Sequence, residues 1–104
     1  MIPILFHPEA EYELDQAISY YEDHQVGLGL DFESEVRRGL SYIHDAPDRW
    51  PKHKFDIRKF LLNRFPFHLF YLELPDCIWI VAVTHCSRKP NYWKERLKSS
   101  PGDK

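Results

Sequence analysis

The chain has 104 residues, close to the commonest length of a single domain, and its 43% of hydrophobic residues suffices for one compact core. It contains no stretch of about 18 apolar residues, which excludes a membrane-spanning helix. Residues 1–8 lack a basic region followed by an apolar run, so we expect no signal peptide and a cytoplasmic location.

The formal net charge of −2 hides an uneven distribution of charge along the chain. Residues 1–48 hold 2 Lys or Arg against 11 Asp or Glu, a balance of −9, whereas residues 49–104 hold 12 against 5, a balance of +7. A polyanionic partner would therefore meet the second half. The alternative is that the two halves attract each other within one domain.

The first part of the chain predicts a short strand and then a helix. Ile2–Phe6 is apolar and ends just before Pro8, a residue that suits the first position of a helix. Apolar residues then recur at helical spacing as far as Tyr21. We expect Gly27 and Gly29 to end this helix.

A second helix is predicted from about Asp31 to His44, with Pro47 beyond its end. Its apolar residues form one stripe, made of Phe32, Val36, Leu40 and Ile43. Gly39 lies beside this stripe and should let the first helix approach closely. The short connection through the glycines implies an antiparallel helix hairpin.

The second half predicts three strands, at Phe55–Asn63, Phe67–Leu74 and Cys77–His85, with a proline between each pair. The last segment is nearly all apolar, which is typical of a central strand covered on both faces. A short helix is predicted from Pro90, and residues 99–104 are expected to form a flexible tail.

The element order β-α-α-β-β-β, with a short C-terminal helix, predicts one α+β domain over residues 1–98. The helix hairpin must bury its apolar stripe, so it should pack on one face of a small, mostly antiparallel sheet. The first strand has no sequential partner. It should therefore pair at the sheet edge or insert beside a later strand.

Cys77 and Cys86 bracket the last predicted strand, roughly 30 Å apart if that segment is extended. A disulfide needs Cα atoms within about 7 Å, so the two thiols should remain unpaired. The sequence has no close set of zinc ligands and no phosphate-binding glycine loop. We therefore expect neither a metal nor a cofactor.

Five segments, in this order, resemble the RelE/ParE toxin superfamily across about residues 4–96. They are Phe6–Ala10, Ala17–Glu22, Gly27–Phe32, Arg64–Tyr71 and Ile80–Pro90. No single segment is specific to the superfamily, but the ordered combination is.

The resemblance implies a toxin that is neutralised by an antitoxin wrapped around it. RelE-like members of the superfamily cut messenger RNA on the ribosome, whereas ParE-like members inhibit DNA gyrase and lack an acid–base site. The motifs are similar to those of plasmid-stabilisation proteins of the ParE type. Three hypotheses follow: a ParE-like gyrase inhibitor, a RelE-like ribosome-dependent endoribonuclease, and a non-toxic member that only binds an antitoxin.

A ribonuclease would need a base, an acid and cations at the phosphate. A tight hairpin before the last strand would place His85 opposite Pro66 and close to Arg64, with Arg88 just past the strand end. His68 would then share a face with His85. His85, Arg64 and Arg88 are therefore the candidate catalytic residues, and a hydrogen-bonded structural histidine is the alternative for His85.

Binding to either possible target, gyrase or messenger RNA on the ribosome, should use basic and aromatic residues of the second half of the chain. The candidates are Arg58, Arg64, Arg88, Lys89, Tyr92 and Trp93. Tyr92 and Trp93 could stack on bases or instead seal the end of the sheet. The mildly acidic composition argues against action on the ribosome, because phosphate binding favours strongly basic proteins.

The antitoxin is expected to lay an amphipathic helix against the helix hairpin and to form a toxin–antitoxin hetero-oligomer. Tyr12, Tyr20 and Leu28 are the candidate contacts. The alternative for these three residues is partial burial within the domain.

Overall fold

The computed structural model describes residues 2–101, so residues 102–104 of the predicted tail lie outside the described residues. Within this range the elements are β1 (Ile4–Phe6), α1 (Pro8–His24), α2 (Leu28–Asp45), η1 (Pro47–Arg49), η2 (Lys54–Asp56), β2 (Arg58–Leu61), β3 (Phe67–Glu73), β4 (Ile78–His85) and η3 (Lys94–Ser99). This order confirms the predicted α+β class. No helix among the described residues is long and apolar enough to cross a membrane.

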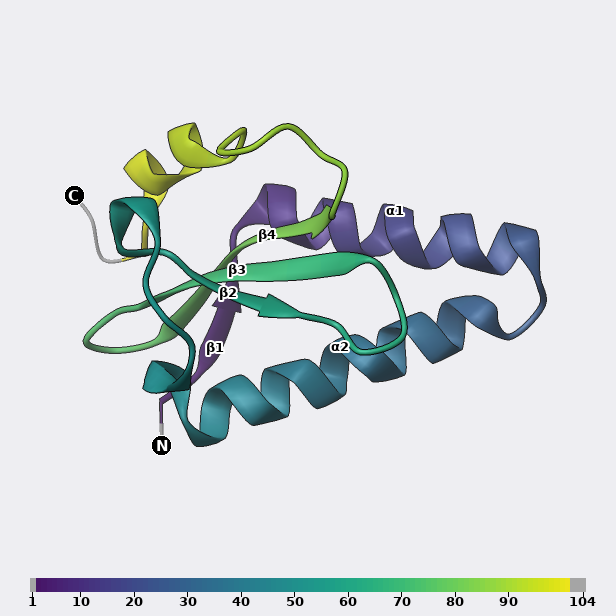
Figure 1. The fold of residues 1–104 in the computed structure, drawn as a ribbon, viewed down its shortest axis with the longest axis horizontal. Coiled ribbons are helices and arrows are strands. Elements are labelled where there is room, and N and C mark those ends of the chain that lie inside the picture. Colours follow the sequence, from purple (N-terminus) through teal and green to yellow (C-terminus); the bar gives the residue numbers. More distant parts are fainter. Residues whose placement is uncertain (1, 102–104) are drawn as a thin grey trace.

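The sheet has four strands in the order β1-β4-β3-β2 (Figure 1). β1 runs parallel to β4, and the other pairs are antiparallel. The first strand therefore lies at the sheet edge and beside a later strand, which combines the two predicted placements. The antiparallel helices α1 and α2 lie along one face, and their connecting end projects beyond the sheet (Figure 1).

The sheet carries a core on each face. The larger core lies under the helices and is built around Phe32, Val36, Ile43, Leu69, Tyr71 and Ile80. The smaller core lies under the C-terminal segment and contains Ile57, Cys77, Trp79, Val81, Ala82 and Trp93. Residues 78–84 of β4 are buried without exception, which confirms the predicted central strand covered on both faces.

Helix α1 begins at Pro8, as predicted, and His7 caps it. The His7 Nδ1 atom accepts a hydrogen bond from the backbone N–H of Glu9 at 2.9 Å, so it satisfies one of the amide groups that a helix start leaves free. His7 is buried, and this desolvation lowers its pKa, which keeps the ring neutral and able to accept. The sequence assigned no role to this histidine.

The glycines act differently from their predicted roles. Gly27 adopts φ +89° between the helices, but Gly29 lies inside the first turn of α2. A Cβ on Gly29 would stand 2.6 Å from the carbonyl oxygen of Ile18, so Gly29 is where α1 and α2 approach closely. The prediction that Gly39 serves this purpose is wrong, because Gly39 faces the Phe60 ring of the sheet instead.

Two predicted elements are shorter in the structure. β2 starts at Arg58 rather than Phe55, because Phe55 and Asp56 have φ near +60° inside η2, a conformation that no strand contains. The C-terminal helix starts at Lys94 rather than Pro90 and is a 3-10 helix. Ser99, the first residue of the predicted tail, still belongs to it.

The predicted register of β3 and β4 is wrong by one residue at the far end. The predicted tight turn between β3 and β4 is confirmed, since the Leu74 N–H donates to the Cys77 carbonyl. A β-bulge between Phe70 and Tyr71 then shifts the pairing, so that His85 faces Phe67 rather than Pro66. His85 therefore points to the helix side, on the opposite face from His68, which pairs with Thr84.

Candidate binding surfaces around the end of strand β4

Strand β4 loses its neighbour halfway along, because β1 ends at Phe6 and the chain turns into α1. Two side chains replace the missing strand. The Glu13 Oε1 atom accepts a hydrogen bond from the Val83 N–H at 3.0 Å, and the Arg96 Nη1 donates to the Val81 carbonyl at 2.9 Å. The backbone groups left free on this edge are thus satisfied by side chains.

Glu13 and Arg96 also bind each other. The two Arg96 Nη atoms lie 2.9 and 2.8 Å from the two carboxylate oxygens of Glu13, a bidentate arrangement. Both side chains are mostly buried, at 14% and 13% exposure. This pair ties α1 to β4 and to the C-terminal segment, and the sequence reasoning missed it because Glu13 and Arg96 stand 83 residues apart.

Tyr92 extends this arrangement toward the surface. Its hydroxyl donates to Glu13 Oε2 at 2.5 Å, and burial together with this bond raises the Tyr92 pKa to about 12. The Arg88 guanidinium lies over the ring, 3.9 Å from its centroid. Tyr92 therefore holds Arg88 in place just beyond the end of β4.

On the helix side, Arg88 borders a hollow of about 570 Å³, which we call the α1 hollow. Its lining includes Tyr12, Gln16, Tyr20, Phe67, His85 and Arg88. Tyr12 and Tyr20 are more than half exposed. Exposed aromatic side chains beside a hollow are typical of a protein-binding surface.

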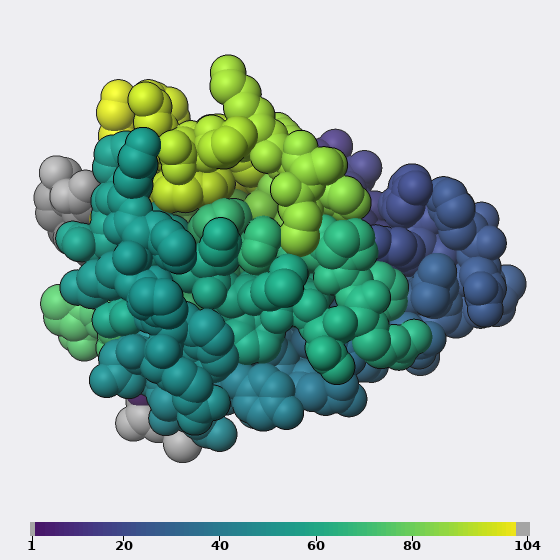
Figure 2. Space-filling model, viewed as in Figure 1, coloured from purple at the N-terminus to yellow at the C-terminus, as the bar shows by residue number. Residues whose placement is uncertain are grey.

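On the other side of the sheet, two adjoining hollows of about 150 and 290 Å³ form a basic groove. Its basic lining residues are His53, Lys54, Lys59, His68, His85, Arg88 and Lys89, and no Asp or Glu is among the described residues that line it. Figure 2 shows the yellow-green C-terminal segment beside the teal segment that precedes β2. Trp93 joins the two, because its ring packs against Phe55 and Phe70.

From the sequence, His68 was expected only to share a sheet face with His85 and was given no role in the site. Burial, followed by the charges of Lys59 and His53, lowers its pKa, so the ring is neutral near pH 7. Its Nδ1 lies 3.7 Å from the Cys86 thiol. A neutral imidazole among cations can accept a proton, whereas the His85 Nδ1 already accepts from the Ser87 N–H at 3.0 Å.

The three candidate catalytic residues do not converge on one point. Arg64 lies in the turn before β3, where its guanidinium faces Asp31 of α2 at 3.7 Å. It lines neither the α1 hollow nor the basic groove, whereas His85 and Arg88 line both. The catalytic role of these residues stays a prediction.

The candidate target-binding residues differ in accessibility. Arg88 and Lys89 are exposed, and Tyr92 is half-buried. Arg58 is largely buried and binds Glu73 at 3.1 Å and the Trp50 carbonyl. Trp93 is buried in the smaller core, which is the sealing role that the sequence offered as its alternative.

The three residues predicted to contact an antitoxin also differ in accessibility. Tyr12 and Tyr20 are exposed, whereas Leu28 is half-buried and packs against the larger core. Two apolar residues that the sequence reasoning did not select are more exposed: Val26 at 90% and Leu30 at 65%. Val26 lies in the link between α1 and α2, and Leu30 lies in the first turn of α2. This end of the helix hairpin projects beyond the sheet (Figure 1).

Comparison with known proteins bears on the fold. Among solved structures, the chain is similar to one described as the chromosomal ParDE TA system from P. aeruginosa, with a TM-score of 0.69 and 17% sequence identity. The match covers 82% of this chain and 96% of the other. No protein-family model and no curated protein matches the chain. The likeness confirms the predicted RelE/ParE-like fold.

Replacing Glu13 by glutamine should destabilise the domain by about 3 kcal/mol, because Arg96 would keep a mostly buried charge without its bidentate partner. Urea denaturation measures the change. Glu11→Gln, an exposed change on the same helix, is the matched control and should alter stability by less than about 0.5 kcal/mol. Equal effects of the two substitutions would show that the Glu13 pair contributes nothing specific.

Proposed function

We propose that this chain is the toxin of a two-component module and is neutralised by a cognate antitoxin. The observation that carries the proposal is the similarity to the ParDE system, which extends over 82% of this chain. The exposed apolar surface of the helix hairpin supports it, since each of four side chains there is more than half exposed: Tyr12, Tyr20, Val26 and Leu30. Such a surface is suited to a protein partner.

We further propose that the toxin acts by binding DNA gyrase, as the resemblance to ParE-like members implies. Arg64, His85 and Arg88 do not surround a common point, so the arrangement favours a binding protein over a nuclease. The exposed Arg88 and Lys89 at the end of β4 supply the target contacts in this proposal. Arg88 is held there by Tyr92, so its position is fixed before the target arrives.

A ribosome-dependent endoribonuclease is the second candidate, and the basic groove is the observation that favours it. The groove places Lys59 and Arg88 beside the neutral ring of His68. Cations at the phosphate and a base for the 2′-hydroxyl are the groups that RNA cleavage requires. In this case His68, rather than the predicted His85, would be the base.

Induced expression of the chain in a bacterium should arrest growth, with filamentation and induction of the SOS response, because a poisoned gyrase leaves broken DNA. Plating and microscopy measure both effects. His68→Ala and His85→Ala should leave the arrest intact. Rapid transcript cleavage that falls by about 100-fold or more in either variant would instead establish the nuclease. No growth effect would leave the third hypothesis, a non-toxic member that binds only an antitoxin.

Replacing Tyr12 and Tyr20 together by alanine should weaken binding of the antitoxin while leaving the toxin folded, because both rings are exposed. Loss of two interface aromatics should lower affinity by about 30-fold or more. Calorimetry with the protein encoded beside this chain measures the loss. Glu11→Ala with Asp15→Ala, two exposed changes on the same helix outside the α1 hollow, is the control, and an equal loss there would contradict the assigned surface.

A further inference from the structure

The α1 hollow has the size and the lining of a small-molecule site. Its volume of about 570 Å³ lies within the usual range of such sites, which are mostly apolar and carry a few polar groups. Its aromatic lining residues come from α1 and β3, and its basic ones come from the end of β4 and the residues that follow. The aromatic residues are Tyr12, Tyr20, Tyr21 and Phe67, and the basic ones are His85 and Arg88.

The hollow has a net positive charge, because its one carboxylate is already compensated. Glu13 is the only acidic residue among the described residues that line it. The two Glu13 oxygens lie 2.9 and 2.8 Å from the Nη atoms of Arg96. They also accept from the Val83 N–H and from the Tyr92 hydroxyl. The charge of Arg88 therefore dominates the hollow, and an anion that enters it meets no uncompensated acid.

A turn after β4 brings the two basic residues together as hydrogen-bond donors. The Arg88 N–H donates to the His85 carbonyl at 3.0 Å, which closes this turn. The Arg88 guanidinium lies over the Tyr92 ring, and no carboxylate of the described residues pairs with it. The His85 Nδ1 accepts from the Ser87 N–H, so Nε2 carries the proton of the neutral ring and can donate. Together these donors suit a carboxylate.

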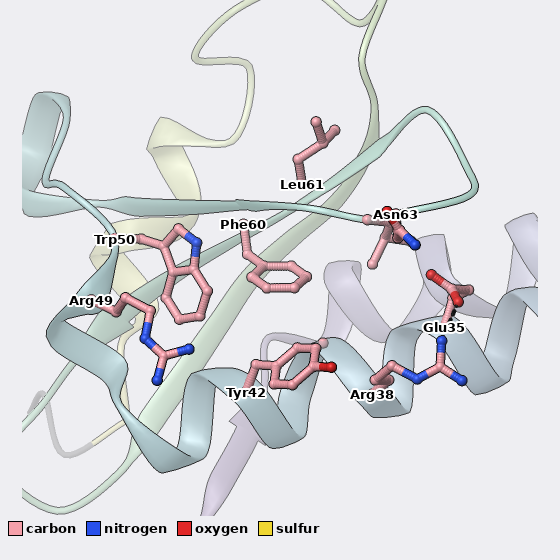
Figure 3. Close-up of a pocket in the computed structure, with 10 residues that line it drawn as sticks. Glu35, Arg38, Tyr42, Arg49, Trp50, Phe60, Leu61 and Asn63 are labelled. Atoms are coloured by element: carbon pink, nitrogen blue, oxygen red, sulfur yellow. Dashed lines mark hydrogen bonds and ion pairs between the residues drawn. The ribbon is translucent and has the colours of Figure 1, made fainter.

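The larger groove between β2 and α2, of about 750 Å³, does not offer such a pair of donors (Figure 3). There the Arg38 guanidinium already pairs with the buried carboxylate of Glu35 at 2.6 Å. Figure 3 shows Arg49 on the other side of Tyr42 from this pair. An acid in this groove would compete with Glu35 and meet one arginine at a time. The α1 hollow is therefore the better site for an anion.

We propose that the α1 hollow binds a small molecule that joins an aromatic ring system to a carboxylate. The carboxylate accepts from Arg88 and from the Nε2–H of His85, and the ring system packs against the aromatic lining. This site goes beyond the toxin function and does not depend on it. Tyr12 and Tyr20 are also the proposed antitoxin contacts, so such an acid would compete with the antitoxin for the hollow.

The test is a titration of the purified chain with naphthylacetate, followed by NMR and calorimetry. A ligand of this size should bind with a Kd of about 1 mM or lower, and shift the resonances of Tyr12, Tyr20 and His85. Naphthylacetamide has the same ring system without the charge and should bind about tenfold more weakly. Acetate, which has the charge without the ring system, should cause no shifts over the same concentrations.

Two charge-removing variants locate the carboxylate. Arg88→Gln should weaken naphthylacetate binding by about tenfold, to the affinity of the amide, and leave the amide unchanged. Lys89→Gln removes the same charge from the next residue, which lines the basic groove but not the α1 hollow, and should keep the wild-type affinity. Arg88 and Lys89 are both exposed, so both variants should remain folded.

Several results would overturn the proposal. These are equal binding of the acid and its amide, an equal loss in Lys89→Gln, and shifts confined to residues of the basic groove. A tripeptide with a C-terminal naphthylalanine that binds at least about tenfold more tightly than naphthylacetate would assign the hollow to the end of a protein chain instead. The titration involves neither growth nor an antitoxin, so its failure is distinct from failure of the toxin proposal.

Discussion

The carboxylate of Glu13 stands where a strand would otherwise lie beside β4. β1 stops after three residues because Pro8 begins a helix, and the edge of β4 beyond Ile80 would be left with buried, unsatisfied backbone groups. Glu13 and Arg96 bond to Val83 and Val81 and to each other. One ion pair therefore closes the sheet edge, anchors α1 and holds the C-terminal segment on the second face.

Both candidate surfaces depend on this arrangement. The C-terminal segment carries Arg88 and Lys89, and Tyr92 joins it to Glu13. The α1 hollow lies on the helix side of β4 and the basic groove on the other, with His85 and Arg88 lining both. A contact with a partner at α1 and a contact with a target at the C-terminal segment are thus linked through a few side chains. Under the proposed function, this proximity is the route by which a bound antitoxin would block the target site.

Both explanations offered for the uneven charge along the chain apply to this structure. The Glu13–Arg96 and Asp31–Arg64 pairs join the acidic half to the basic half, which is the internal attraction offered as one alternative. The cations of the basic groove have no acidic residue among its described lining, so they are free for a partner. The sequence alone could not divide the charges between these uses, because the division depends on which face each strand residue occupies.

Much of the fold follows from local patterns, whereas the site depends on long-range geometry. The helix start at Pro8, the apolar run of β4 and the turn at Pro75 are local signals, and each led to a correct element. The bulge beside Phe70 has no local signal, yet it alone moves His85 to the opposite face from His68. The positive φ at Phe55 likewise shortened a strand that its apolar composition favoured.

The claim that a side chain completes the sheet is tested most directly by the amide of Val83. Its N–H has no strand partner, and its only bond in the structure is to Glu13. If the account is right, hydrogen exchange at Val83 is as slow as at Ile78, whose N–H donates to the Pro3 carbonyl, and proceeds through global unfolding. Exchange at Val83 as fast as at exposed amides, with Ile78 still protected, would contradict it.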